Sequence, residues 1–230
     1  MSLTQVKSLL TSLKLNGMAA VFEKSLDDAK KDEWTTLETL DALLQAESDF
    51  REWRKIKSRI KTSKLRGSSG ASFEDFDFTA RRSITKAQIK EIYSLKWLED
   101  GRPLVLIGQT GVGKSFIAQA AGLHACGHGK SVLFLSVTHW MESQAQARAT
   151  GTYLKFRAQM IRPDLLVLDD FGMRKFTAVE AEDLREIIEE RSYGKSTLVT
   201  TQLPLDHWAE VLPDRTLGAG RAADRARDSA

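Results

Sequence analysis

The fold of this chain is decided by the stretch Gly108-Gln109-Thr110-Gly111-Val112-Gly113-Lys114-Ser115. This stretch fits the phosphate-loop pattern G-x-x-x-x-G-K-S/T at every position. The apolar run Leu104–Ile107 before it predicts a buried strand, and residues 116–121 after it predict a helix. Because strand, loop and helix follow one another in the order that the pattern requires, the sequence predicts binding of a nucleoside triphosphate.

Each residue type in the loop has a chemical role. Glycines at 108, 111 and 113 allow backbone conformations closed to residues with a Cβ atom, so that successive N–H groups can turn toward phosphate oxygens. The helix N-terminus adds further N–H groups and a positive dipole end. We expect Lys114 to contact the β- and γ-phosphates and Ser115 to bind Mg²⁺. The predicted cofactor-binding residues are Gly108, Gln109, Thr110, Gly111, Val112, Gly113, Lys114, Ser115 and Phe116.

Strands and helices alternate after the loop. We expect further strands at residues 131–137, 165–168 and 196–201, and helices from about 138, over 153–161 and over 178–191. Another helix is expected over about 85–98, before the first strand. The alternation predicts an α/β fold in which helices cover a mostly parallel sheet. Because ligands of such folds bind at the carboxyl ends of the strands, polar residues there are candidates for the site.

Two of these strands end in polar residues. Asp169 and Asp170 follow the apolar run 165–168, where a first carboxylate can bind Mg²⁺ and a second can orient or activate the attacking water. We assign Asp169 to the metal, together with Ser115, and Asp170 to the water. Thr200-Thr201-Gln202 closes the last strand and is expected to lie beside the same metal, where a polar residue can sense the γ-phosphate or position the water; Thr201 and Gln202 are the candidates for this role. The predicted catalytic residues are Asp170, Lys114, Gln202 and Thr201.

The N-terminal part predicts a separate unit. Leucines at helical spacing and a capping box at Thr35 and Glu38 indicate a small helical domain over residues 1–66. Its end carries eight basic residues between Arg51 and Arg66 and a single acid, Glu52. Such a row suits DNA phosphates, and a solvated helix face is the alternative. We expect a linker with an aromatic strip over 67–80, the ATPase domain over 81–217 and an atypical tail over 218–230.

Composition narrows the class of protein. The apolar runs are far shorter than the roughly 20 residues of a membrane-spanning helix, and the N-terminus lacks the apolar block of a secretory signal. A single cysteine, Cys126, excludes an internal disulfide. The four histidines lack the spacing of zinc ligands. We therefore expect a cytoplasmic protein that does not act at a membrane.

These motifs resemble those of the IstB-like ATPases, helpers of insertion-sequence transposition that are related to the helicase loader DnaC. The resemblance rests on the phosphate loop, on residues 165–172 and on residues 190–204, and it extends over about 3–217. It implies a P-loop AAA+ three-layer domain preceded by a helical N-terminal domain. By position, it makes Asp169 and Asp170 the Walker B pair and Gln202 or Thr201 the sensor.

The resemblance also implies partners. Members of the family are expected to bind ATP and Mg²⁺, to self-associate into a ring or spiral on double-stranded DNA, and to recruit or stimulate a transposase. Two other functions stay open. A helicase loader of DNA replication has the same nucleotide site with a different partner, and a nucleotide-binding module without turnover uses ATP for stability alone.

The sequence departs from the family pattern after Leu217. Relatives continue with a helix whose arginine serves the nucleotide of the neighbouring subunit and with a last strand, whereas residues 218–230 here include no large apolar residue that could be buried. We expect this tail to be poorly ordered, and the strand 104–107 to lie at the edge of the sheet. Hydrolysis and assembly are expected to suffer more than nucleotide binding, since Arg221, Arg225 and Arg227 have no defined place.

Overall fold

A computed structural model describes residues 2–65, 73 and 84–213 of the chain. The chain forms two compact units, and the division between them lies between Ser58 and Arg59. The predicted tail, and all of the predicted linker apart from Phe73, lie outside the described residues. None of the helices within the described ranges combines the length and the apolar character that crossing a membrane requires.

The first unit is built of helices, as predicted. They are α1 (Leu3–Ser12), α2 (Asn16–Lys31) and α3 (Thr36–Thr62), the last turn of which belongs to the second unit. Met18, Phe22 and Leu43 form a small buried core. The first unit therefore has a few apolar contacts in its interior, and polar contacts between α2 and α3 supplement them.

Buried Glu47 on α3 holds the start of α2. Its Oε2 accepts hydrogen bonds from the backbone N–H groups of Gly17 (2.7 Å) and Met18 (3.3 Å), and its Oε1 accepts one from Arg51 Nε (2.7 Å). The helix lies so close to α3 that a Cβ atom on Gly17 would be 2.5 Å from the carbonyl oxygen of Ala46. A carboxylate at a helix N-terminus satisfies N–H groups that have no partner within the helix. Close packing and this cap explain the glycine at 17.

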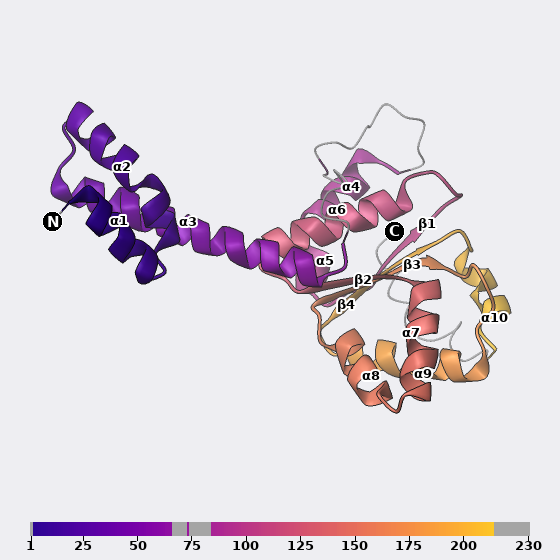
Figure 1. Cartoon of the computed structure of the whole chain (residues 1–230). Helices are drawn as coiled ribbons and strands as arrows, with labels where there is room; N and C mark the ends of the chain where they lie inside the picture. The colour runs from indigo at the N-terminus through magenta and orange to yellow at the C-terminus, as the bar shows by residue number, and fades with distance from the viewer. Residues whose placement is uncertain (1, 66–72, 74–83, 214–230) are drawn as a thin grey trace. The chain divides into compact units, whose positions relative to one another are not determined.

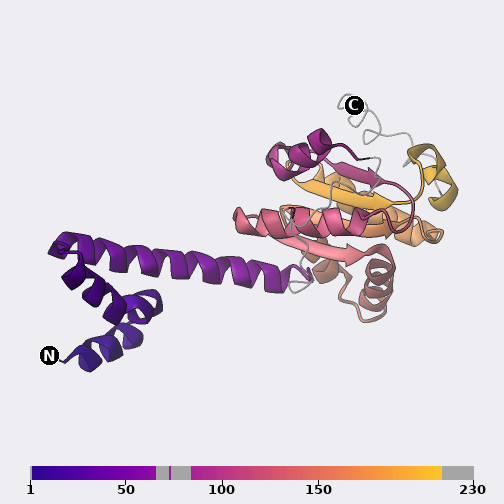
Figure 2. The same ribbon diagram turned by 90° about the horizontal axis from the view of Figure 1, so that it is seen from above.

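A parallel sheet organises the second unit, and this confirms the predicted fold class. Its strands are β1 (Leu104–Ile107), β2 (Val132–Ser136), β3 (Leu165–Phe171) and β4 (Ser196–Thr201). They lie in the order β1-β4-β3-β2, and the arrows in Figure 2 all point the same way. In the described part of the chain β1 is an edge strand, as expected. The opposite edge is partly covered after α3, because Phe134 N–H donates to the carbonyl of Ser63 (2.8 Å).

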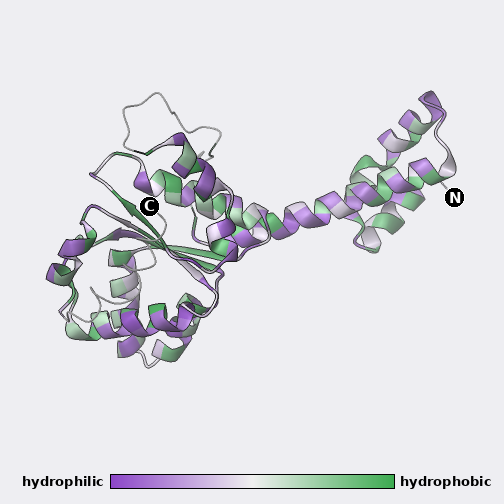
Figure 3. Ribbon diagram, turned by 180° about the vertical axis from the view of Figure 1, so that it is seen from behind, coloured by the Kyte–Doolittle hydropathy of each residue, from purple (hydrophilic) through white to green (hydrophobic). Residues whose placement is uncertain are grey.

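Helices cover both faces of the sheet (Figure 1). One face carries α4 (Lys86–Tyr93), α5 (Lys96–Glu99) and α6 (Lys114–Gly127). The other carries α7 (Val137–Ala149), α8 (Tyr153–Ile161), α9 (Ala178–Arg191) and the short α10 (Trp208–Val211), which follows a 3₁₀ turn at Leu205–His207. Figure 3 shows the hydrophobic strands between these layers. Leu165–Leu168 of β3 are at most 1% exposed, so the sheet centre is the core.

One predicted helix was wrong. Residues 85–98 form two helices instead of one, because Leu95 adopts a left-handed backbone conformation with φ of 55°. The break turns the chain so that Leu95, Trp97 and Leu98 are all buried. Trp97 Nε1 also donates to the carbonyl of Ile92 (3.1 Å). Burial of three large side chains favours a conformation that a non-glycine residue rarely adopts.

The amino ends of the strands are held by a buried arginine. Arg191, at the end of α9, is 1% exposed and donates to the carbonyls of Met160 (3.0 Å), Pro163 (2.8 Å) and Ser196. Burial lowers its pKa to about 10. The segment 190–197, one of those that carry the family resemblance, thus has a structural role at the end of the sheet opposite to the phosphate loop.

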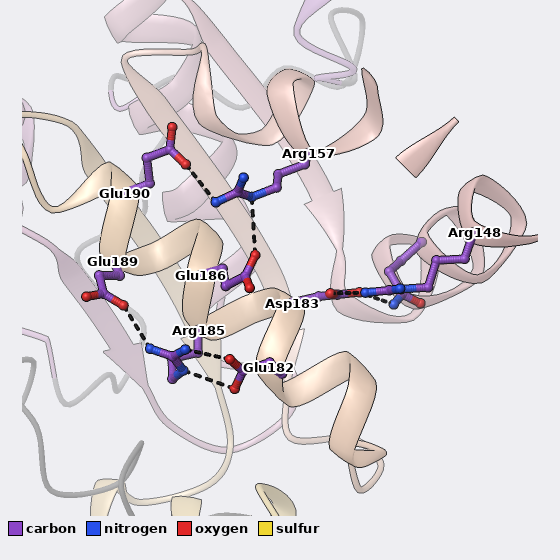
Figure 4. A network of polar contacts seen from close by, with 9 residues as sticks. Arg148, Arg157, Glu182, Asp183, Arg185, Glu186, Glu189 and Glu190 are labelled. Atoms are coloured by element: carbon purple, nitrogen blue, oxygen red, sulfur yellow. Dashed lines mark hydrogen bonds and ion pairs between the residues drawn. The ribbon is translucent and has the colours of Figure 1, made fainter. Parts of the chain in front are cut away.

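Ion pairs join the outer helices α7, α8 and α9 (Figure 4). Arg157 of α8 contacts Glu186 (3.5 Å) and Glu190 (2.9 Å) of α9. Buried Asp183 of α9 accepts from Arg148 Nε of α7 (2.9 Å). Most of these side chains are at least partly exposed, so the network orients the helices more than it stabilises the fold.

Candidate functional site

The phosphate loop lies between β1 and α6. Gly111 and Gly113 have φ of 81° and 95°, the left-handed conformations that the sequence predicts for them. The reason given for Gly108 was wrong, because its φ is not positive. Its requirement is space: a Cβ atom there would lie 3.1 Å from Cγ2 of Val112. Gly108 N–H donates to the carbonyl of Thr201 (3.1 Å), which fixes the loop to the end of β4.

The loop presents donors to solvent. Residues 109–112 are exposed, and Gly113 precedes α6 without giving it a side-chain cap. Buried Lys114 turns back under the loop, where its Nζ donates to the carbonyl of Gln109 (2.9 Å). Phe116 packs partly buried against the core, so a contact with phosphate would come from its backbone. A helix N-terminus and an ammonium group at one place make an anion-binding site.

Ser115 and Asp169 meet directly, although 54 residues separate them. Ser115 Oγ donates to Asp169 Oδ1 (2.9 Å), and Thr200 Oγ1 donates to the same oxygen (2.5 Å). Hard oxygen donors of this kind suit Mg²⁺, which commonly takes one or two protein ligands and completes its shell with water and phosphate. Within the described ranges no three His, Cys, Asp or Glu side chains lie together as a metal site. The Ser115 and Asp169 oxygens are ligands that fit Mg²⁺ bound together with a nucleotide.

Asp170 differs from its neighbour. Its φ is 60°, it lies where the β3–β4 ladder shifts register, and its side chain is exposed beside the loop. Although the residue is exposed, partial desolvation of its carboxyl raises the pKa of Asp170 above its ordinary value, the charge of Asp169 adds to the rise, and Lys114 opposes it. A carboxylate with a raised pKa accepts a proton more readily, which suits a group that activates water.

The two sensor candidates lie apart from the acid pair. Thr201 is fully buried, and its hydroxyl donates to the carbonyl of Phe171 (2.8 Å) and accepts from Leu203 N–H (2.9 Å). Gln202 is exposed, and its Nε2 donates to Met173 Sδ (3.4 Å). Thr200 contacts the acid pair instead; the sequence placed it beside the metal but did not count it among the catalytic candidates. Alternation along β4 puts Thr200 and Thr201 on opposite faces, but only the register tells which one meets Asp169.

The basic segment of α3 is more varied than its charge suggests. Arg51 pairs with Glu47, and Lys55 lies 3.3 Å from Glu52. Lys57 Nζ lies 4.6 Å from the ring centroid of exposed Trp53. Arg66 lies outside the described residues. Some basic residues of the segment therefore contact residues of the first unit, while others are exposed cations of the kind that can bind a polyanion.

Sequence comparisons place the chain among known proteins. The profile of a family described as IstB-like ATP binding protein matches residues 8–225. A Sinorhizobium fredii protein named as an insertion-sequence ATP-binding protein is 32% identical, over 90% of this chain and 84% of its own length. A Mycobacterium tuberculosis protein, named as an ATP-binding protein in an insertion sequence, is 31% identical, over 91% of this chain and 83% of its own.

Structure comparisons concern the fold. AMPPCP-bound DnaA from Aquifex aeolicus superposes with a TM-score of 0.56 at 21% identity, covering 65% of this chain and 46% of that one. DnaI gives a TM-score of 0.54 at 20% identity, covering 69% and 84%. These likenesses confirm the predicted P-loop AAA+ architecture of the second unit.

Proposed function

This chain belongs to the family of IstB-like ATP binding proteins, and we propose that it binds and hydrolyses ATP with Mg²⁺ to assist the transposition of an insertion sequence. The similar proteins are named for ATP binding and for insertion sequences. The observation that carries the proposal is the contact between Ser115 Oγ and Asp169 Oδ1, 2.9 Å apart. It joins the phosphate loop to the acid pair, which are the two halves of an ATPase site.

The residues of the site have different roles. The loop N–H groups and the start of α6 bind phosphate oxygens, and Lys114 exchanges the Gln109 carbonyl for the β- and γ-phosphates. Ser115 and Asp169 hold Mg²⁺, which when bound neutralises charge that develops on the phosphates. Asp170 orients the attacking water and accepts its proton. Gln202, exposed beside this end of the sheet, is a second polar group that can reach the γ-phosphate.

The DNA-related part of the proposal rests on α3. Its exposed cations bind the phosphates of double-stranded DNA without reading sequence. We propose that ATP promotes self-association of the protein on DNA, in a ring or spiral, and that this assembly recruits or stimulates a transposase. Support comes from family membership and from the charge of α3.

ATP hydrolysis with and without duplex DNA tests this function. Lys114→Ala should reduce ATP binding and abolish DNA-stimulated hydrolysis, because the loop loses its only charged side chain. Lys155→Ala removes an exposed lysine from α8 and is the control. Wild-type protein that binds ATP but shows no turnover, with or without DNA, would leave only a nucleotide-binding module.

A further inference from the structure

We propose that Thr200 is a positioning residue that sets both members of the acid pair, an inference that rests on the proposed function. Thr200 lies on β4 and is fully buried. Its hydroxyl donates to Asp169 Oδ1 (2.5 Å) and accepts a hydrogen bond from the backbone N–H of Asp170 (3.0 Å). One side chain thus fixes the carboxylate of the first acid and the backbone of the second.

The strand register explains why Thr200 reaches both acids. β3 and β4 pair regularly up to Leu168 opposite Val199, and pairing resumes at Phe171 opposite Thr201. Asp169 and Asp170 therefore face a single residue of β4. A bulge of this kind disrupts the ladder and leaves a backbone group without its usual partner. Here the Thr200 hydroxyl accepts the hydrogen bond that a regular ladder would have given to a backbone carbonyl.

The first consequence concerns the metal ligand. Asp169 Oδ1 receives hydrogen bonds from Ser115 on α6 and from Thr200 on β4, so the carboxylate is bound from two elements. If Ser115 and Asp169 held Mg²⁺, the hydrogen bond from Thr200 would still orient the carboxylate. Partners of this sort tune a metal site without touching the metal, and removing one typically costs about 10–100-fold in metal affinity or activity.

The second consequence concerns the residue that activates water. Asp170 adopts a left-handed conformation that is unfavourable for a residue with a Cβ atom. The hydrogen bond to Thr200 stabilises that conformation. Without the acceptor, the unpaired N–H of Asp170 favours a return to a regular ladder, and a shift of one residue along a strand turns a side chain to the other face of the sheet. Thr200 therefore keeps the Asp170 carboxylate on the side of the phosphate loop.

Three substitutions distinguish a positioning role of Thr200 from a role in the stability of the fold. Thr200→Val keeps the shape and removes both hydrogen bonds, whereas Thr200→Ser keeps the hydroxyl. Ser196→Ala removes a buried hydroxyl from the other end of β4, where it donates to the carbonyl of Trp97 (3.2 Å), and controls for a general loss of stability. Thr200→Ala, whose smaller side chain leaves room for water, replaces Thr200→Val if that variant does not fold.

Two readouts are measured on the full chain. Binding of a fluorescent ATP analogue is titrated with Mg²⁺ and repeated in EDTA, and steady-state hydrolysis gives kcat and KM. We expect Thr200→Val to raise the half-saturating Mg²⁺ concentration by about 10–100-fold and to lower kcat by about as much, while KM and binding in EDTA change little. Thr200→Ser should restore both, and Ser196→Ala should lower the melting temperature alone.

Two outcomes with the Thr200 variants would overturn the inference. A Thr200→Val protein with a lower melting temperature but normal Mg²⁺ dependence and kcat would assign Thr200 a purely structural role. If Thr200→Ser fails to restore the Mg²⁺ dependence, the Thr200 hydroxyl is not the group that positions Asp169. If the wild-type protein binds the analogue with Mg²⁺ but does not hydrolyse ATP, the proposed catalysis fails while the binding readout still decides the role of Thr200 toward Asp169. If the wild-type protein binds no analogue at all, both the proposed function and this inference are wrong.

Discussion

At the scale of single residues, two neighbouring aspartates acquire different chemistry from their backbones. Asp169 is buried, and its carboxylate accepts hydrogen bonds from the hydroxyl groups of two different elements, which fix its orientation. Asp170 has a left-handed backbone, and partial desolvation of its carboxyl, to which the neighbouring Asp169 adds, raises its pKa. The loop pattern and the acid pair could be predicted because each is read from local sequence. The sequence could not show that Thr200, and not Thr201 or Gln202, contacts the acid pair, since this follows from a bulge that no residue type indicates.

Asp170→Asn should abolish turnover and keep ATP binding. Loss of the base is expected to lower kcat by about 10²–10⁴-fold, while Lys114 and Ser115 still bind nucleotide. In the wild type, kcat should fall as pH drops through the raised pKa of Asp170, because the protonated acid cannot accept a proton. The measurements are nucleotide binding and a pH profile of kcat. Lost ATP binding in this variant would assign Asp170 to the metal or to the fold.

The same variant should be more stable than the wild type at neutral pH. An acid whose pKa is raised on folding disfavours the folded state at pH values above its ordinary pKa, because the unfolded chain holds the charged form more easily. Asparagine removes that cost and tolerates the left-handed conformation. The melting temperature should therefore rise at pH 7, and the gain should shrink as pH falls through the raised pKa. An equal gain at all pH values would point to the backbone alone.

At the scale of elements, the alternation of strands and helices was sufficient to predict the parallel sheet. The periodicity failed at residues 85–98, because helical spacing continues across the turn at Leu95 and only burial of Trp97 and Leu98 explains the break. The fixation of α2 on α3 was likewise not predicted. From the sequence, Glu47 cannot be distinguished from an exposed acid of a helix. Only the structure shows that it accepts hydrogen bonds from the N–H groups of Gly17 and Met18.

Glu47→Gln should destabilise the first unit. Burial would raise the pKa of Glu47, but the hydrogen bonds from Arg51, Met18 and Gly17 outweigh it and hold the pKa below its ordinary value. Stability from this carboxylate is therefore present at neutral pH and is lost as pH falls through the lowered pKa. Hydrogen exchange of α1 and α2 amides measures the effect. Glu52→Gln, at an exposed position of α3, is the control, and equal exchange in both variants would contradict the cap.

At the scale of the whole molecule, the chain joins an AAA+ unit to a helical unit through α3, whose bounds extend across the division at Ser58. The helical nature of the first unit and the parallel sheet of the second followed from periodicity. The residues proposed to contact DNA could not be chosen from charge alone, since Arg51 and Lys55 contact acids on their own helix. Arg54 and Lys57 instead lie near the rings of Phe50 and Trp53, where the cations stay accessible.

The double substitution Arg54→Gln and Lys57→Gln should therefore weaken binding of duplex DNA and flatten its salt dependence. Each phosphate contact contributes about 0.9 to the slope of log K against log salt, so loss of two contacts lowers the slope by about 1.8. The change should be the same for unrelated DNA sequences, because phosphates carry no sequence information. Lys30→Gln with Lys31→Gln removes equal charge from exposed positions of α2 and is the matched control. If both pairs change the slope equally, the effect is that of net charge, and α3 is not the DNA-binding element.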